Sequence, residues 1–176
     1  LLAHSADTDN FWIEYSRRRL VAIGLPPVSA KELAPQVSAH MGEMYKPESI
    51  VPEDVRRLLP ALKGAGYILA VISNREKPFH ELLASHNLNE YFHFSLAAGE
   101  VDIYKPDPGV FKHALDRAKV TAQETVYVGD NYFADVVGSR RAGLQPVLYD
   151  PNGIFPEADC NTIKSFDELD AVIKGL

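Results

Sequence analysis

The chain has 176 residues, 46% of them hydrophobic, which is enough to bury the core of one domain with a small appendage. Its formal net charge of −6 argues against a nucleic-acid or anionic-membrane partner, because either would require a basic surface. The single cysteine, Cys160, excludes an internal disulfide. The sequence contains no run of about 18 apolar residues, the length that a membrane-spanning helix needs, so we expect a cytoplasmic protein.

Residues 1–49 are predicted to form a small helical unit without strands. Apolar and aromatic side chains recur at helical spacing up to Ile23, and a second helix is predicted from Ser29 or Ala30 to Tyr45. The three consecutive arginines at positions 17–19 could recognise an anionic substrate. A solvated helix face is the simpler interpretation of such a run.

From residue 50 to residue 176, strands alternate with helices. Helices are predicted at 52–65, 78–86, 108–119 and 134–142, and strands at 67–72, 92–96, 125–128 and 146–149, followed by a weak strand and helix between 163 and 173. The run at 67–72 is continuously apolar, as in a strand buried on both faces. This alternation predicts an α/β fold with a parallel sheet.

The strand at 125–128 is followed by two carboxylates, Asp130 and Asp135. Gly129 allows a sharp turn after the strand, and a helix from residue 134 is expected to end at Gly143. Asp135 then lies in the first turn of that helix, close to Asp130, and such a pair suits Mg²⁺. Each residue also has an ordinary alternative, since Asp130 could cap the helix and Asp135 could interact favourably with its dipole.

Three further polar side chains are predicted near the ends of parallel strands, where open sheets bind their ligands. Ser73 and Asn74 follow the strand at 67–72, and Lys105 precedes the helix at 108–119. The hydroxyl of Ser73 and nearby backbone N–H groups could hold phosphate oxygens, and the ammonium group of Lys105 could neutralise a phosphate. A serine-asparagine pair is also common in ordinary turns, so the prediction of a phosphate-binding site depends on the three residues occurring together.

The series V-I-S-N at 71–74, I-Y-K-P-D-P-G-V-F at 103–111 and V-Y-V-G-D-N-Y-F-A-D at 126–135 resembles the haloacid dehalogenase-like hydrolase superfamily. Ser73 matches its second motif, Lys105 its third, and Asp130 with Asp135 its fourth. The resemblance implies a Rossmann-like, doubly wound core at 50–176 and a small helical cap at 1–49. It also implies a Mg²⁺ cofactor and hydrolysis of a small phosphorylated metabolite through an aspartyl-phosphate. Ser73, Lys105 and Asp130 would be catalytic, and Asn74 would join Ser73 and Lys105 in binding phosphate.

The sequence departs from the pattern of the superfamily at one motif. Its first motif is an apolar strand that ends in D-x-D and supplies the nucleophile. The letters at positions 7–9 are Asp-Thr-Asp, but the preceding residues 1–6 are too short and polar for a central strand. Because the chain opens in the cap segment, we expect the nucleophile to lie upstream and these 176 residues alone to be inactive.

Two other functions are compatible with the same motifs. A 2-haloacid dehalogenase displaces halide from carbon without a metal. That reaction does not need a metal-binding carboxylate at Asp130, which argues against it. A catalytically inactive module of the same superfamily would bind a partner or a phosphorylated ligand through the surviving site. The sequence does not determine the substrate, the pathway or the oligomeric state.

Overall fold

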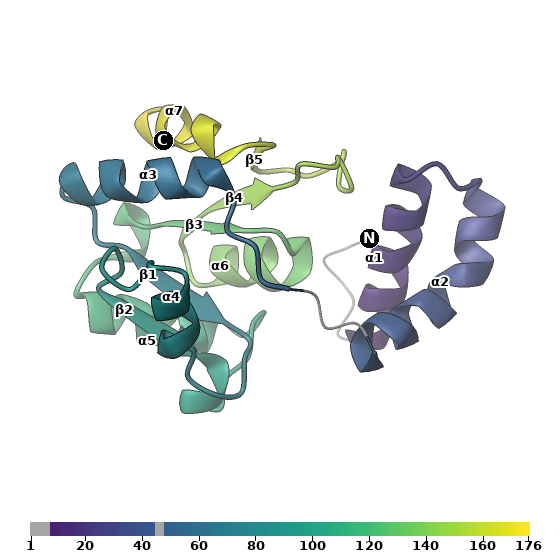
Figure 1. The fold of residues 1–176 in the computed structure, drawn as a ribbon, viewed down its shortest axis with the longest axis horizontal. Helices are drawn as coiled ribbons and strands as arrows, with labels where there is room; N and C mark the ends of the chain where they lie inside the picture. The colour runs from purple at the N-terminus through teal and green to yellow at the C-terminus, as the bar shows by residue number, and fades with distance from the viewer. Residues whose placement is uncertain (1–7, 45–47) are drawn as a thin grey trace.

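The computed structural model describes residues 8–44 and 48–176. Two long helices come first, α1 at Thr8–Ala22 and α2 at Pro27–Glu43, and they pack against each other as a hairpin. Proline suits the first turn of a helix because its missing N–H would have no partner there, which explains why α2 begins at Pro27, ahead of the predicted start. Figure 1 shows this hairpin beside the remaining elements.

In the described residues, five short strands form two parallel sheets. One sheet pairs β1 with β2, and the other has the order β3-β4-β5. The strands span Ala70–Ser73 (β1), Phe94–Ala97 (β2), Val126–Gly129 (β3), Gln145–Tyr149 (β4) and Asn161–Ile163 (β5). Because all the pairs are parallel, the carboxyl ends of β1 and β2 meet at one edge of their sheet, and those of β3, β4 and β5 meet at one edge of theirs.

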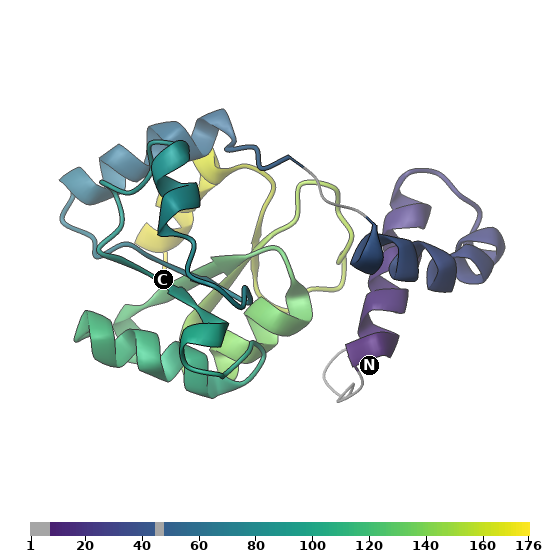
Figure 2. The same cartoon turned by 60° about the horizontal axis from the view of Figure 1, so that its bottom comes forward.

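Helices cover both faces of these sheets, as Figure 2 shows. One core cluster packs Phe111 of α5 against Phe94 and Leu96 of β2, and another packs Leu169 of α7 against Val147 of β4. The helices span Glu53–Gly64 (α3), His80–Ser85 (α4), Pro108–Ala118 (α5), Gly138–Arg141 (α6) and Leu169–Lys174 (α7), with 3-10 turns at Ala98–Glu100, Ala122–Glu124 and Phe166–Glu168. This arrangement confirms the predicted α/β, Rossmann-like fold.

Two predicted elements were wrong in their details. The strand predicted at 67–72 begins only at Ala70, and Tyr67 and Ile68 are 41% and 48% exposed. Their apolar character does not reflect burial on both faces, because β1 has a strand partner on one side only. The helix predicted from residue 134 to residue 142 is a π-helix at Tyr132–Val137, followed by the single α-helical turn of α6.

The free edges of β1 and β3 face each other. No backbone ladder joins these two strands within the described chain, yet the hydroxyl of Tyr127 on β3 donates to the carbonyl of Ile72 on β1 at 3.3 Å. Strands at the centre of a parallel sheet are normally buried on both faces, whereas the residues of β3 are all half-buried. The unpaired edge of β1 and the unpaired edge of β3 therefore lie on either side of one gap between the two sheets.

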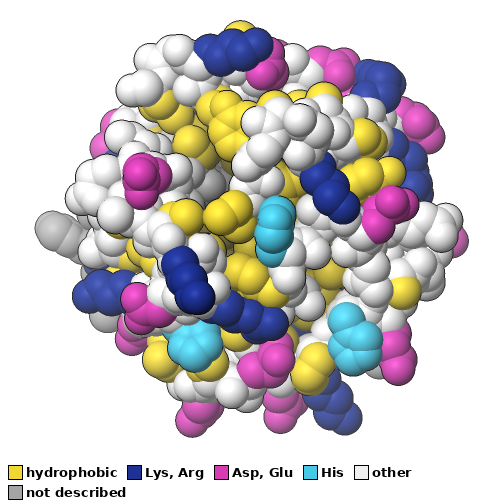
Figure 3. All heavy atoms as spheres, turned by 90° about the vertical axis from the view of Figure 1, so that its left-hand side faces the viewer, with side chains coloured by type: hydrophobic (Ala, Val, Ile, Leu, Met, Phe, Trp, Pro, Cys, Tyr) yellow, Lys and Arg dark blue, Asp and Glu magenta, His cyan; other side chains and the backbone are white. Residues whose placement is uncertain are grey.

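The surface mixes side chains of different kinds. On the face shown in Figure 3, basic and acidic side chains are interspersed, with hydrophobic side chains between them. None of the described helices is long and apolar enough to cross a membrane. The boundary predicted between residues 49 and 50 stays a prediction.

Candidate active site

The candidate site lies where β1 and β3 end. Ser73 is the last residue of β1, and Asp130 directly follows Gly129, the last residue of β3. Both strands belong to parallel sheets whose free edges face each other, so their carboxyl ends bring the two polar residues to the same edge. In the described chain the Ser73 hydroxyl makes no hydrogen bond, which leaves it available to a ligand.

Asp135 is held in place by the turn between β3 and the π-helix. The side chain of Asn131 accepts a hydrogen bond from the N–H of Ala134 at 2.9 Å and so caps the helix. Asp135 Oδ2 accepts from the N–H of Asn131 at 2.9 Å, and the residue is only 3% exposed. A Cβ atom at position 129 would lie 2.3 Å from Asp135 Cγ, so this close approach requires Gly129.

Lys105 is the cation of the site. Its Nζ donates to Asp135 Oδ1 at 2.7 Å and to the hydroxyl of Tyr127 at 3.0 Å, and the carbonyl of Ile72 lies 3.5 Å away. The side chains of Lys105 and Asp135 are 11% and 5% exposed, so the pair is almost fully desolvated. Little water screens this charge interaction, which makes the position of the ammonium group well defined.

The backbone of Lys105 is fixed by Asn74. The side-chain N–H of Asn74 donates to the carbonyl of Lys105 at 2.9 Å, and Asn74 Oδ1 accepts from the N–H of Lys105 at 2.8 Å. Two reciprocal hydrogen bonds lock the loop that carries the lysine onto the end of β1. The structure thus gives Asn74 a positioning contact, and its contact with phosphate stays a prediction.

Asp130 carries the exposed negative charge of the site. Desolvation by the surrounding groups, and then the charge of Asp135, raise the pKa of the Asp130 carboxyl, although part of the residue faces solvent. Lys105 opposes this shift only in part, because its ammonium group is already paired with Asp135. The site therefore presents negative charge that an added cation would stabilise.

These contacts bear on the predicted Mg²⁺ site. Both oxygens of Asp135 already accept hydrogen bonds, whereas Asp130 forms no ion pair with the described residues. Mg²⁺ in proteins is commonly bound through one or two carboxylates, with waters and substrate phosphates as the other ligands. Asp130 fits that pattern as a ligand, and no group of three or more acidic, histidine or cysteine side chains gathers among the residues described.

The sequence analysis missed two residues of this cluster. Tyr127 was interpreted only as part of a buried strand, and Asn131 only as part of a motif. Burial and the charge of Asp135 raise the pKa of Tyr127 well above its ordinary value of 10.0, so its hydroxyl stays protonated beside Lys105. A tyrosine in an apolar strand is normally a core residue, so its sequence context gave no signal of this contact.

Comparisons with known proteins identify relatives of the chain. The family model for haloacid dehalogenase-like hydrolases matches residues 28–148. A phosphoserine phosphatase of Thermus thermophilus is 35% identical over 142 residues, which cover 80% of this chain and 55% of that protein. The (S)-2-haloacid dehalogenase 4A of Burkholderia cepacia is 33% identical over 121 residues, which cover 68% of this chain and 52% of that protein.

The fold has matches among solved structures as well. The crystal structure of an HAD phosphatase from Thermococcus onnurineus superposes with a TM-score of 0.68 at 21% identity, covering 94% of this chain and 90% of that chain. This similarity concerns the fold. The chain spans about half the length of the two curated relatives named above, at 55% and 52%.

Proposed function

Because the chain belongs to the haloacid dehalogenase-like hydrolase family, we propose that the complete protein hydrolyses the phosphate monoester of a small metabolite with the aid of Mg²⁺. The observation that carries this proposal is the exposed carboxylate of Asp130 beside the buried Lys105–Asp135 pair. A dianionic phosphoryl group needs both a cation and positive side chains, and this site offers places for both. The phosphoserine phosphatase relative favours the same reaction.

Each residue has a defined part in this proposal. Asp130 would hold Mg²⁺, and the bound ion would neutralise negative charge on the phosphoryl oxygens. Lys105 would donate a hydrogen bond to the phosphoryl group, and Asp135 would keep the ammonium group in position. The free hydroxyl of Ser73 would donate to another phosphoryl oxygen.

The attacking group is proposed to come from a strand inserted between β1 and β3. The unpaired edges of β1 and β3 support this, since a parallel strand placed there would give partners to the backbone groups of both edges and join the two sheets. An aspartate at its carboxyl end would lie between Ser73 and Asp130. Its carboxylate would attack phosphorus, the bond to the ester oxygen would break, the alcohol would leave with a proton, and water would hydrolyse the aspartyl-phosphate.

A second candidate is 2-haloacid dehalogenase activity, which the Burkholderia cepacia relative favours. That reaction displaces halide from carbon without a metal ion, so it does not explain the exposed carboxylate of Asp130. The two reactions are separated by measuring halide release and phosphate release with and without EDTA. Halide release that persists in EDTA, without any phosphate release, would replace the phosphatase proposal with this one.

The proposed function is tested by assaying the complete protein with p-nitrophenyl phosphate. EDTA should abolish hydrolysis and added Mg²⁺ should restore it. Asp130→Asn or Lys105→Ala should lower kcat by about 10² to 10³, because each removes charge stabilisation from the transition state. Arg57→Ala, at an exposed ion pair with Asp167, serves as the matched control. Rates within threefold of wild type for both site variants would contradict the assignment, and an absence of all turnover would favour the inactive binding module.

A further inference from the structure

A cavity of about 300 Å³ lies between β2 and the helices α4 and α5. Its size is at the lower end of the range for small-molecule sites in proteins. The apolar part of its lining consists of Pro78, Leu83, Phe92 and Phe94, and polar residues complete it. None of the described residues that line this cavity belongs to the candidate active site, so the proposed function does not explain it.

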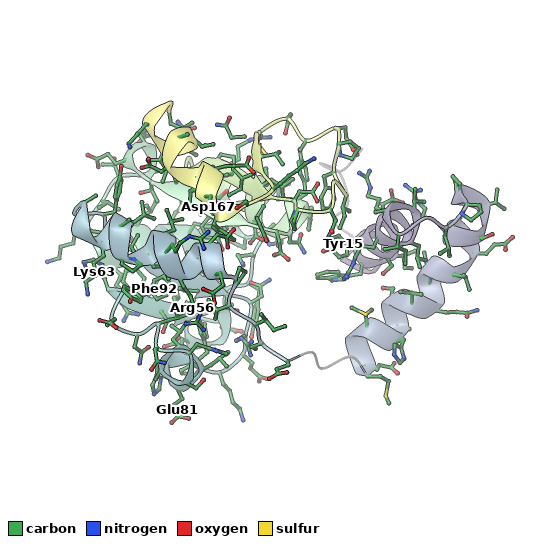
Figure 4. The ribbon with its side chains drawn as sticks, turned by 45° about the horizontal axis from the view of Figure 1, so that its top comes forward. Tyr15, Arg56, Lys63, Glu81, Phe92 and Asp167 are labelled. Carbon is green, nitrogen blue, oxygen red and sulfur yellow. The ribbon has the colours of Figure 1, made fainter. Side chains whose placement is uncertain are left out.

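One wall of the cavity is held in place by α3. The side chain of Arg56 donates to the carbonyl of His86 at 3.1 Å, and the ammonium group of Lys63 donates to the carbonyl of Glu90. Figure 4 shows Arg56 and Lys63 on α3, with Phe92 between α3 and α4. Because the loop between α4 and β2 is attached at two points, the wall that includes Phe92 is ordered before a ligand arrives, which reduces the entropy lost on binding.

Two opposite charges line the cavity without pairing. The guanidinium carbon of Arg117 lies 4.5 Å from the centroid of the Phe94 ring, and its Nη1 lies 3.4 Å from the carbonyl oxygen of Ser95. Glu100 Oε2 accepts a hydrogen bond from the N–H of Ala97 at 2.6 Å. In the part of the chain that the structure describes, neither Arg117 nor Glu100 forms an ion pair. The cavity therefore presents a cation held by an aromatic ring and a carboxylate held by the backbone.

Two further polar side chains of the lining have no partner. The amide of Asn89 and the ring nitrogens of His80 make no hydrogen bond with the described residues. An amide offers both donors and an acceptor, and a neutral imidazole offers one of each, so either can bond to a carboxylate or to an ammonium group. A few such polar groups beside an apolar wall are typical of a small-molecule site.

From this arrangement we propose that the cavity binds a free α-amino acid with an apolar or aromatic side chain. The carboxylate of the ligand pairs with Arg117, because a planar guanidinium group binds a carboxylate through two parallel hydrogen bonds. Its ammonium group donates to Glu100, and its side chain lies on the apolar wall that includes Phe92. A ligand with one charge of each sign matches a cavity that offers one of each. This site is independent of the proposed phosphatase function.

The experiment titrates L-phenylalanine and L-leucine into the ¹⁵N-labelled complete protein and follows the backbone amides by NMR. At least one of the two should shift amides in the segments 78–83 and 89–95, which line the cavity. For L-phenylalanine the matched probes are 3-phenylpropionate, which lacks the ammonium group, and phenethylamine, which lacks the carboxylate. Each should bind roughly tenfold more weakly, as expected for one lost charge-assisted contact. The isovalerate and isoamylamine pair tests L-leucine in the same way.

Arg117→Gln and Glu100→Gln should each weaken binding of the amino acid by roughly tenfold. The glutamine at position 100 keeps an oxygen that can accept from the N–H of Ala97, so the turn is preserved. Arg57→Gln is the matched control, because it removes the same charge at an exposed pair with Asp167 and should leave the affinity unchanged. The dispersion of the amide spectrum checks the folding of each variant.

Three results would overturn this inference. They are no shifts in either segment up to about 10 mM of both amino acids, which is ten times the Kd of a weak site of about 1 mM, affinities unchanged in both Arg117→Gln and Glu100→Gln, and shifts confined to the surroundings of Asp130. Hydrolysis of p-nitrophenyl phosphate is measured on the same samples. Protein that binds the amino acid but hydrolyses no phosphate monoester would overturn the proposed function alone.

Discussion

Lys105 is positioned by contacts from several parts of the fold. Its ammonium group meets the carboxylate of Asp135 and the hydroxyl of Tyr127, while Asn74 fixes its backbone. The Tyr127 hydroxyl accepts from Lys105 and donates to the carbonyl of Ile72, so it uses both of its hydrogen-bonding capacities. Since the lysine itself is long and flexible, these partners determine where its charge lies.

Tyr127→Phe should therefore lower kcat by about threefold to tenfold, because the loss of one hydrogen bond costs about 0.5–1.5 kcal/mol. The KM for p-nitrophenyl phosphate should change less than kcat, which distinguishes a misplaced lysine from general unfolding. Tyr149→Phe is a suitable control, since Tyr149 ends β4 and its ring packs against Phe166 of the 3-10 turn at Phe166–Glu168. If kcat of Tyr127→Phe stayed within 1.5-fold of wild type, roughly the resolution of such a comparison, the positioning role would be wrong.

The two aspartates should respond in opposite directions to neutralisation. Asp135→Asn removes the charge partner of a nearly buried lysine and should cost about 3–5 kcal/mol of unfolding free energy. Asp130→Asn should instead raise the melting temperature of the metal-free protein near neutral pH. It removes a carboxylate whose pKa is raised above its ordinary value of 3.8 by desolvation and by Asp135.

The pH dependence follows from the sign of that pKa shift. A carboxyl with a raised pKa binds its proton more tightly in the folded state, so its contribution to stability is fully present below the ordinary pKa of 3.8 and is lost as pH rises through the folded-state pKa. The melting-temperature advantage of Asp130→Asn should grow between about pH 4 and about pH 7. Calorimetry in EDTA measures it. An advantage that shrinks over this range would contradict the assigned cause.

At the scale of single elements, the sequence predicted the alternation of strands and helices well because hydrophobic periodicity is a local signal. It predicted the end of the helix at Gly143, whose φ of +88° confirms the expected left-handed conformation. It did not predict the π-helix at Tyr132–Val137, because this element depends on the cap by Asn131 and on the buried contact between Asp135 and Lys105. The second of these is a tertiary contact across 30 residues.

The same distinction applies to the candidate site. Ser73, Lys105, Asp130 and Asp135 were found because short motifs and strand ends mark them in the sequence. The packing of α1 against the loop that contains Phe155 could not be predicted, since it depends on contacts between residues far apart in the sequence. Motifs thus mark the residues of the candidate site, whereas the contacts that Asn74 and Tyr127 make with Lys105 required the structure.

The docking of α1 depends in part on the pair between Arg18 and Glu157, in which the Arg18 side chain is 16% exposed. Glu157→Gln should weaken this docking by up to about 1 kcal/mol, the usual range for a partly solvated ion pair. Hydrogen exchange in α1 should then accelerate by up to about fivefold. Asp167→Asn removes a comparable but more exposed pair with Arg57, far along the chain from α1, and should leave exchange in α1 unchanged. Equal exchange rates in α1 for both variants would mean that the ion pair does not hold this helix.

At the scale of the whole molecule, the structure consists of two sheets that no backbone ladder connects within the described residues. Side-chain contacts join them, including the hydrogen bond from Tyr127 to Ile72 and the pair of Lys105 with Asp135. The strand proposed between β1 and β3 would pair with the free edge of each and join the two sheets into one continuous parallel sheet. The candidate site lies at the end of that proposed strand, so the stability of the sheet and the supply of the nucleophile depend on the same segment.

A polypeptide of only these 176 residues should consequently differ from the complete protein in both stability and activity. Because unpaired strand edges are poorly protected, we expect fast hydrogen exchange in β1 and β3 and no detectable hydrolysis of p-nitrophenyl phosphate. In the complete protein, exchange in both strands should slow by at least about 10²-fold, since pairing would give these amides stable partners. Complete protein that carries Asp130→Asn separates the two effects, as it should keep the protection and lose the activity. Equal exchange in β1 and β3 of the two polypeptides, or full activity of the shorter one, would show that no strand enters between them.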